Sequence, residues 1–340
     1  MQTAIANESQ AKQVQIALKE AAVADQIDAR IVVTESKPWN FAVGLANTGS
    51  KATGHDRFTV SGSHANVFNL DHQFTGAYTT SIERGADVQQ FGANYRIPLY
   101  RMGGVLGLGY THSNVVGDFG ALKSTGAGQT MGINYSQYLP PDGGYRSYLT
   151  LAFDDRRFDV TEINDIPVPG QLTRRSRPLS LGYTARVESD SAICGYDATL
   201  SLNVPTSGAG NNLTAYRSED TRITRTSFQV LRVNGNYLGA MAGGWLLGAK
   251  TQIQYSPTAL IAGEQLGLGG ASTIRGTGER PISGDSGILG SLEVSTPELA
   301  TGLRLLGFVD AGWLRNHNPN PNPKPAHDQL ASVGLGLRYQ

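Results

Sequence analysis

The sequence predicts an all-β fold, a transmembrane antiparallel β-barrel, and three observations support this prediction. Apolar residues alternate with polar or glycine residues from Trp39 to the end of the 340-residue chain, the pattern of strands that have one apolar face. The alternating segments are roughly 10 to 14 residues long, as tilted membrane strands require. Short and long connections also follow one another in turn, as expected for a barrel with two different rims.

The alternation predicts about fourteen strands in series. In the last segment, Val333, Leu335 and Leu337 share one face, and glycine, serine and arginine share the other. A soluble β-sandwich also alternates, but its strands average only about 5 to 6 residues. Charged residues fall on the polar face, because Lys or Arg at the lipid midplane costs about 2 to 4 kcal/mol. The clearest segments are 39–47, 104–112, 147–154, 196–204, 247–254 and 332–339.

The connections predict which rim faces which side of the membrane. Short connections are expected at 67–71, 99–102, 139–143, 189–191, 240–243 and 298–301. Longer connections are expected at 114–124, 157–173, 205–221, 257–286 and 314–328, with short exceptions near 48–55 and 85–87. Because bacterial outer-membrane barrels have short periplasmic turns and long exterior loops, the long connections are predicted to lie outside.

The N-terminal 37 residues follow a different pattern. Residues 13–19 and 29–35 favour a β-hairpin, although the alanine-rich stretch 17–25 would also suit a helix. Lys37-Pro38 ends the unit, because the residue before proline is driven out of helical geometry. Residues 1–10 lack the basic start and apolar core of a signal peptide, which suggests a fragment of a longer protein.

Composition argues against several other functions. The 28 basic and 28 acidic residues give no net charge, so no nucleic-acid partner is expected. The glycine-rich run 267–270 lacks the Gly-Lys-Ser/Thr of a phosphate loop, so no nucleotide is expected either. The single cysteine, Cys194, and the scattered histidines predict no metal site and no cofactor. No nucleophile, base and orienting group stand together, so an enzyme is not predicted.

The long connection at about 257–286 is the strongest candidate for a functional segment, because long structureless loops are usually functional or disordered. It carries Arg275 between Ile274 and Gly276. The next two strands place Glu293 and Asp310 on the polar, lumenal face. Two acidic side chains on one lumenal wall require a cation, and Arg275 is the candidate if the loop folds back into the lumen.

Two motifs in this region resemble a known family. The stretch 268–276, Leu-Gly-Gly-Ala-Ser-Thr-Ile-Arg-Gly, resembles a loop motif of the Omp85 superfamily. The stretch 308–312, Phe-Val-Asp-Ala-Gly, resembles a strand motif of the same superfamily. The start of the barrel is similar to two-partner secretion transporters of the haemolysin-activator branch, ShlB/FhaC/HecB, in 34–39, 47–50, 53–54 and 66–70. The resemblance covers about residues 13–340.

The resemblance implies a domain organisation. Residues 1–37 would be the C-terminal remnant of a POTRA domain, and 38–340 would hold about fourteen of the sixteen strands of the family barrel. The loop would plug the pore from outside through the latch motif Gly269, Gly270, Ile274, Arg275 and Gly276. Its partners on the lumen wall would be Glu293, Phe308, Asp310 and Gly312. Thr277 replaces an aromatic residue of the family, so a stacking contact is not expected there.

The resemblance also implies a function. The chain would be an outer-membrane translocator of a Gram-negative bacterium that exports one large TpsA-type partner protein, of haemolysin or adhesin type, in an extended state. Its other partner would be outer-membrane lipid. The alternatives are an Omp85 insertase, which folds other barrels into the membrane, and a passive pore. Whether the Arg275 contact is a fixed latch or a moving gate is left open by the sequence.

Overall fold

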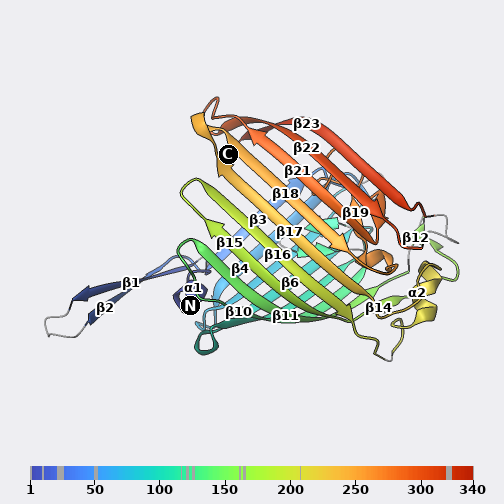
Figure 1. Ribbon diagram of the computed structural model, residues 1–340, viewed down its shortest axis with the longest axis horizontal. Helices are drawn as coiled ribbons and strands as arrows, with labels where there is room; N and C mark the ends of the chain where they lie inside the picture. Colours follow the sequence, from blue (N-terminus) through green and yellow to red (C-terminus); the bar gives the residue numbers. More distant parts are fainter. Residues whose placement is uncertain are drawn as a thin grey trace.

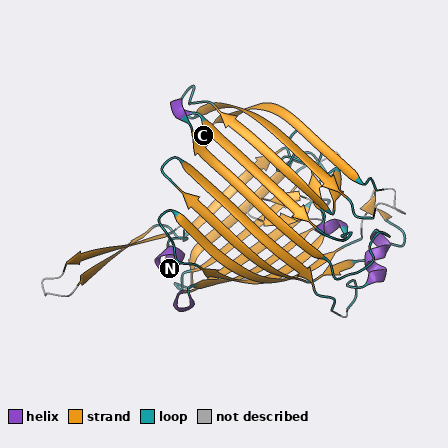
Figure 2. Ribbon diagram, in the orientation of Figure 1, coloured by secondary structure: helices purple, strands orange, loops and turns teal. Residues whose placement is uncertain are grey.

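The computed structural model describes residues 2–9, 11–20, 27–49, 53–115, 117–119, 122–124, 127–160, 162–163, 166–206, 208–318 and 324–339. Within these residues the protein is built almost entirely from antiparallel strands, as Figure 2 shows. No helix in these ranges has both the length and the apolar character to cross a membrane. The expected all-β class is therefore confirmed.

One large sheet contains fifteen strands, and removing β14, which pairs only at the side of β11, leaves a path of fourteen. This agrees with the predicted number. In chain order the path is β3 (Trp39–Ala46), β4 (Arg57–Val67), β5 (His72–Thr80), β6 (Gln89–Leu99), β7 (Gly104–Ser113), β10 (Gly128–Tyr138), β11 (Tyr145–Phe158), β15 (Pro178–Glu188), β16 (Ala192–Asn203), β17 (Gln229–Ala240), β18 (Leu246–Tyr255), β21 (Ser286–Ser295), β22 (Leu303–Arg315) and β23 (His327–Tyr339). The sheet curls into a barrel wall (Figure 1), and within the described residues its end strands β3 and β23 do not pair with each other.

The other elements are short. The predicted N-terminal hairpin is confirmed as β1 (Lys12–Glu20) and β2 (Ile27–Glu35), so residues 17–20 are strand rather than helix; 21–26 lie outside the described residues. The remaining elements are α1 (Gln2–Ala6), η1 (Tyr100–Met102), β8 (Gly117–Phe119), β9 (Leu122–Ser124), β12 (Glu162–Ile163), β13 (Ile166–Pro167), β14 (Arg174–Ser176), α2 (Leu213–Glu219), η2 (Ala242–Gly244), η3 (Ala262–Glu264), β19 (Leu266–Leu268) and β20 (Ile282–Gly284).

The two rims differ as predicted. Short turns join β4 to β5, β6 to β7 and β15 to β16, and they lie at the same end as α1 and the β1–β2 hairpin in Figure 1. The opposite end carries the long loops, with α2, β12 and β14. One expectation was wrong in detail. The loop 257–286 is not structureless, because β19 pairs with β20 to form a small hairpin inside it.

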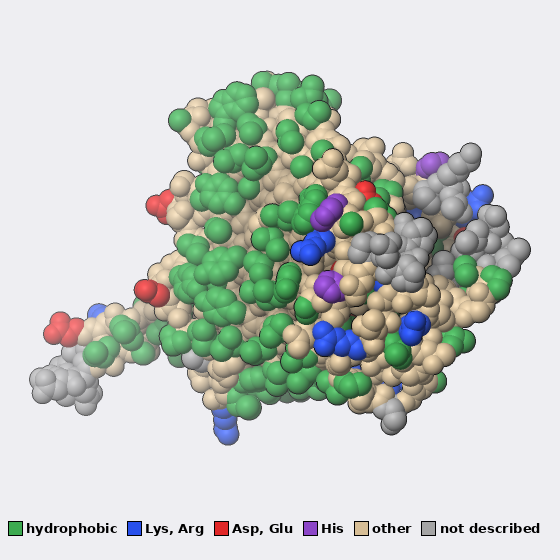
Figure 3. All heavy atoms as spheres, turned by 45° about the vertical axis from the view of Figure 1, so that its right-hand side comes forward, with side chains coloured by type: hydrophobic (Ala, Val, Ile, Leu, Met, Phe, Trp, Pro, Cys, Tyr) green, Lys and Arg blue, Asp and Glu red, His purple; other side chains and the backbone are tan. Residues whose placement is uncertain are grey.

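The faces of the wall also differ as predicted. Outward side chains are apolar and exposed, as illustrated by Val309 at 53% and Leu335 at 90% exposure. Figure 3 shows a broad hydrophobic belt on one side of the molecule. Asp310, one residue along β22 from Val309, points the other way and is 0% exposed. Charged side chains therefore gather on the inner face, as a lipid-exposed outer face requires.

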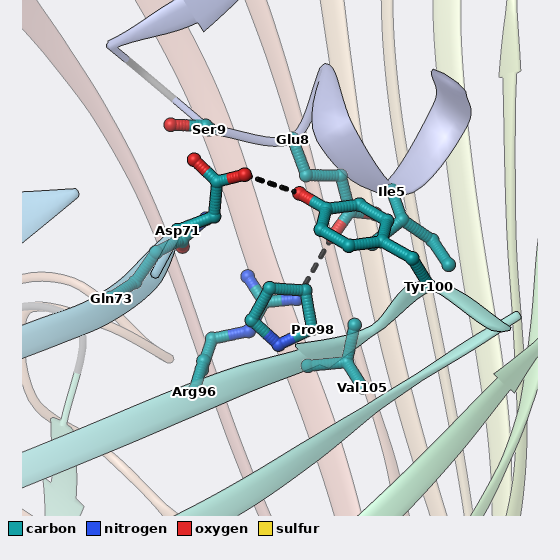
Figure 4. A pocket seen from close by; sticks show the side chains of 9 residues that line it. All are labelled: Ile5, Glu8, Ser9, Asp71, Gln73, Arg96, Pro98, Tyr100 and Val105. Carbon is teal, nitrogen blue, oxygen red and sulfur yellow. Dashed lines mark hydrogen bonds and ion pairs between the residues drawn. The ribbon is translucent and has the colours of Figure 1, made fainter. Parts of the chain in front are cut away.

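The N-terminal segment packs against the inner wall at the short-turn rim (Figure 4). Ile5 is buried in a cluster with Val105 and Tyr138. The Glu8 carboxylate accepts a hydrogen bond from Arg96 Nη2 at 2.8 Å. Nearby, the hydroxyl of Tyr100 donates to Asp71, and Lys12 forms an ion pair with the same Asp71 carboxylate. The N-terminal segment is thus attached to the barrel by two ionic contacts, one through Glu8 and one through Lys12 of the hairpin, although the hairpin itself projects away from the barrel.

Candidate functional site

The tip of the 256–285 loop depends on three glycines with left-handed backbone. Gly269, Gly270 and Gly276 have φ angles of 110°, 99° and 81°. Residues with a Cβ rarely adopt such angles, which accounts for glycine at these positions. Thr273 stabilises the turn because its hydroxyl donates to the carbonyl of Gly269 at 2.7 Å. The sharp turn holds Ile274 and Arg275 against the barrel wall.

Ile274 anchors the tip in an apolar cluster. Its side chain is fully buried among Leu266, Leu268, Leu289 and Leu314, so the cluster joins the loop to β21 and β22. Burial of a side chain of this size stabilises the contact by about 1.5 to 3 kcal/mol. The apolar Ile274 therefore fixes the position of the neighbouring Arg275.

Arg275 reaches Asp310 through three hydrogen bonds. Its Nε and Nη2 donate to the two carboxylate oxygens of Asp310, both at 2.8 Å, and its backbone N–H donates to Oδ2 at 3.1 Å. Such a two-pronged guanidinium–carboxylate contact is stronger and more specific in geometry than a single hydrogen bond. Ser291 Oγ donates to the same carboxylate at 2.7 Å. Asp310 is thus fully engaged and closed off from solvent.

Further groups surround the guanidinium. Arg275 Nη1 donates to Glu293 Oε2 at 2.6 Å, and Arg338 on β23 binds the other oxygen of Glu293 at 3.0 Å. The guanidinium carbon lies 3.6 Å from the ring centre of Phe308, a cation–π contact. Arg275, Glu293, Phe308 and Asp310, which the sequence placed in one lumenal group, therefore do lie together.

Thr277 takes part in the turn through hydrogen bonds rather than stacking. Its hydroxyl donates to the carbonyl of Ile274 at 2.7 Å and accepts from the N–H of Gly270 at 3.2 Å. The threonine therefore closes the loop on itself, whereas an aromatic ring would extend away from it. The expected loss of a stacking contact is accompanied by this gain in local hydrogen bonding.

Gly312 allows the loop to approach the wall closely. A Cβ on Gly312 would lie 2.6 Å from Cδ1 of Leu268, which is itself fully buried. We expect Gly312→Val to push the β19 segment away from β22 and to lower the free energy of unfolding by about 1 to 3 kcal/mol, the usual effect of overpacking. The temperature at which the protein loses its heat-modifiable electrophoretic mobility measures this change.

The control is Gly290→Val on the neighbouring strand β21. Gly290 lies on the outer face, and a Cβ there would meet nothing within 4 Å. This variant should unfold at the same temperature as the parent protein. Equal behaviour of the two valine variants would show that the loop does not press on Gly312.

A second ionic group, which the sequence did not predict, lies nearer the start of the same loop. Glu264 in η3 is 1% exposed and binds Arg156 Nη1 at 2.9 Å and Arg232 Nη2 at 3.1 Å. Ser176 Oγ adds a hydrogen bond at 2.8 Å. Burial raises the pKa of the Glu264 carboxyl, but the two arginines outweigh this effect and hold the pKa below its ordinary value. The loop therefore contributes one anion and one cation to the lumen wall.

A third group closes the base of the loop. The Asp285 carboxylate is 1% exposed and accepts hydrogen bonds from Arg222 Nη1 at 2.7 Å and from the N–H of Leu260 at 3.0 Å. It also accepts from the N–H of His317 at 2.8 Å and from Gln265 Nε2 at 2.9 Å. Asp285 thus joins three exterior loops, 204–228, 256–285 and 316–326, at one carboxylate.

Arg222 is completely enclosed in this third group. Burial lowers its pKa, but hydrogen bonds to Asp285 and Asp220 outweigh burial and raise the pKa above its ordinary value. Lys324 is close by, and both burial and the charge of Arg222 lower its pKa. Its Nζ donates to Gln265 Oε1 at 2.7 Å. No metal ion is needed to explain the third group, because each carboxylate in it is bound by arginine or amide donors.

Comparison with known proteins assigns the chain to a family. The model of the family described as haemolysin secretion/activation protein ShlB/FhaC/HecB matches residues 25–339. The outer membrane transporter CdiB of Dickeya dadantii (strain 3937) is 23% identical over 300 residues, which are 82% of this chain and 50% of that protein. The same transporter of Escherichia coli O6:K15:H31 is 26% identical over 294 residues, 82% of this chain and 48% of the relative. The chain spans about half the length of these curated relatives.

Solved structures agree in fold. CdiB from Escherichia coli matches with a TM-score of 0.79 at 20% identity, over 99% of this chain and 63% of that structure. BamA from Haemophilus ducreyi matches with a TM-score of 0.57 at 16% identity, over 100% of this chain and 71% of that structure. Because the family model matches well over half of the residues, the chain belongs to the ShlB/FhaC/HecB family of outer-membrane β-barrel proteins, within the Omp85 superfamily.

Proposed function

We propose that this chain forms the outer-membrane pore of a two-partner secretion transporter, which exports a large TpsA-type partner protein in an extended state. The observation that carries the proposal is the contact of Arg275 with Asp310 and Glu293, because it holds an exterior loop within the barrel. A passive pore does not require a loop that is bound to the wall by two ionic groups, at Arg275 and at Glu264, and to two other loops by a third group at Asp285. The relatives that are named outer membrane transporters support the same function.

The loop residues have distinct roles in this proposal. Gly269, Gly270 and Gly276 shape the tip, Ile274 anchors it, and Arg275 latches it to the wall. The wall side of the latch is Asp310 and Glu293, with Phe308 beneath the guanidinium and Gly312 providing room for the loop. Energy for export comes from folding of the partner outside, because no nucleotide site is proposed for the chain.

The N-terminal hairpin has its own place in the proposal. Residues 1–37 would belong to a POTRA domain, and 38–340 would form the barrel with its loop at about 257–286. The β1–β2 hairpin has an exposed edge that can add an extended segment of the partner as a further strand. Its attachment through Glu8 and Arg96 would keep this edge near the short-turn, periplasmic entrance.

The function is tested by expressing the full-length transporter with its partner protein in a host that lacks both. Removal of the transporter should leave the partner in the periplasm and leave the abundance of other outer-membrane barrels unchanged. Depletion of many barrels instead would indicate an insertase. Secretion of the partner without the transporter would contradict the proposal.

A further inference from the structure

A groove opens on the outer surface of the barrel at the long-loop end. It has a volume of about 390 Å³ and lies where β18, β21 and β22 meet the exterior loops. This volume falls within the roughly 300 to 1,000 Å³ of typical small-molecule sites. The lining residues that matter for its chemistry are Ile253, Tyr255, Ile288, Trp313, Arg315 and His317.

The groove faces lipid rather than the lumen. Ile288 and Trp313 lie on the outer face of their strands, at 46% and 41% exposure. Tyr255 is the last residue of β18, and Arg315 is the last residue of β22. Aromatic residues at the ends of barrel strands lie at the level of the lipid headgroups. The groove therefore spans the boundary between acyl chains and headgroups.

Arg315 carries an uncompensated charge at this boundary. In the part of the chain that the structure describes, its exposed side chain forms no ion pair, whereas Arg222, Arg232 and Arg275 all bind carboxylates. No aspartate or glutamate is among the residues that line the groove. Figure 3 shows basic and histidine side chains gathered beside the hydrophobic belt. A guanidinium without a protein partner is well suited to a phosphate, which it can bind with two parallel hydrogen bonds.

We propose that this groove binds the phosphorylated headgroup of a lipid of the outer leaflet. Arg315 donates to the phosphate, and Ile253, Ile288 and the ring of Trp313 receive the start of an acyl chain. His317 also lines the groove, and its backbone N–H donates to Asp285, so the bound headgroup would cover the base of the 256–285 loop.

The test uses the full-length protein in detergent, titrated with diphosphoryl lipid A and followed by native mass spectrometry. Arg315→Ala should weaken the binding of lipid A about tenfold, the size expected for loss of a charged hydrogen-bonded pair. Arg315→Lys should weaken the binding by a smaller factor. The control is Arg101→Ala at the short-turn rim, because Arg101 is also exposed and has no ion pair in the described part of the chain. This control should bind lipid like the parent protein.

Two further arms separate the sources of phosphate. Dephosphorylated lipid A with the same acyl chains should bind the parent protein as weakly as diphosphoryl lipid A binds Arg315→Ala. Inorganic phosphate at millimolar concentration should not displace the lipid; displacement would mean a site for soluble anions and would overturn the proposal. Equal loss of lipid binding in the Arg315 and Arg101 variants, or undiminished binding to Arg315→Ala, would overturn the proposal as well.

Trp313→Ala, which keeps every charge, should also reduce lipid binding, and no reduction would exclude the acyl-chain contact.

Discussion

Arg275→Glu is expected to reduce export of the partner protein by about tenfold or more. The new carboxylate would lie beside Asp310, which is fully buried, and Glu293, so three negative charges would meet in one place. Breaking a buried pair costs about 3 to 5 kcal/mol, and water in the lumen reduces this amount. Even about 1.4 kcal/mol shifts the balance between inserted and released loop by a factor of ten. The measurement is the fraction of partner protein that reaches the medium.

Three further variants make this result specific. Arg217→Glu is the matched control: it lies in another exterior loop, is exposed, and forms no ion pair within the described ranges, so export should be unchanged. Arg275→Lys keeps the charge but loses the two-pronged contact, and we expect partial export. Asp310→Arg combined with Arg275→Glu should restore part of the activity. Full export by Arg275→Glu alone would exclude the latch.

The same variant separates a latch from a moving gate. If the contact is only structural, Arg275→Glu should lower both export and the unfolding temperature. If the contact must break during export, the variant should keep a folded barrel but admit large antibiotics that the parent protein excludes. Measuring antibiotic sensitivity together with heat-modifiable mobility distinguishes the two, because a merely unfolded barrel would not reach the membrane.

The wall and the latch could be predicted from the sequence for different physical reasons. In a strand that has one face in lipid, apolar and polar residues must alternate with period two whatever its neighbours are. Segments such as 332–339 can therefore be recognised as strands from their own residues alone. Arg275 could be paired with Asp310 because the loop and the strand each carried a recognisable motif, and two acidic residues on one wall required a cation. The prediction of the strands and the prediction of the Arg275–Asp310 contact each depend on few residues and on regular strand geometry.

The two other ionic groups could not be predicted in this way. Glu264, Arg222 and Asp285 lie in exterior loops, where no periodicity tells which side chains point inward. The arginines that bind Glu264 and Asp285 come from segments that are 32 or more residues away, so only the folded structure brings these charges together. One local signal was available in the loop that carries Arg222, and it indicates a helix rather than an ionic group. Asn212 precedes α2 and accepts a hydrogen bond from the N–H of Ala215, as residues that begin helices often do.

Asp285→Ala is expected to be the most destabilising single change among the exterior loops. It removes one of the two carboxylates that bind Arg222, which is 0% exposed and keeps only Asp220, and it leaves the N–H groups of Leu260 and His317 without an acceptor. Removing one member of a buried ion pair costs about 3 to 5 kcal/mol. The loops should then open together and become accessible to added protease on intact cells, because one carboxylate joins all three.

Two comparison variants identify the cause of this loss. Asp285→Asn keeps an oxygen that can accept from Leu260 and His317 but removes the charge that Arg222 needs, so its effect should be intermediate. Asp87→Ala, at an exposed ion pair with Arg84, should change stability by less than about 1 kcal/mol. If the loops of Asp285→Ala resist protease as well as those of Asp87→Ala, the three loops are held by their apolar contacts, chiefly the Phe158, Tyr216 and Leu260 cluster, and not by Asp285. The expected difference arises because the Arg84–Asp87 pair is exposed to solvent, which can solvate the remaining charge, whereas the side chain of Arg222 is 0% exposed.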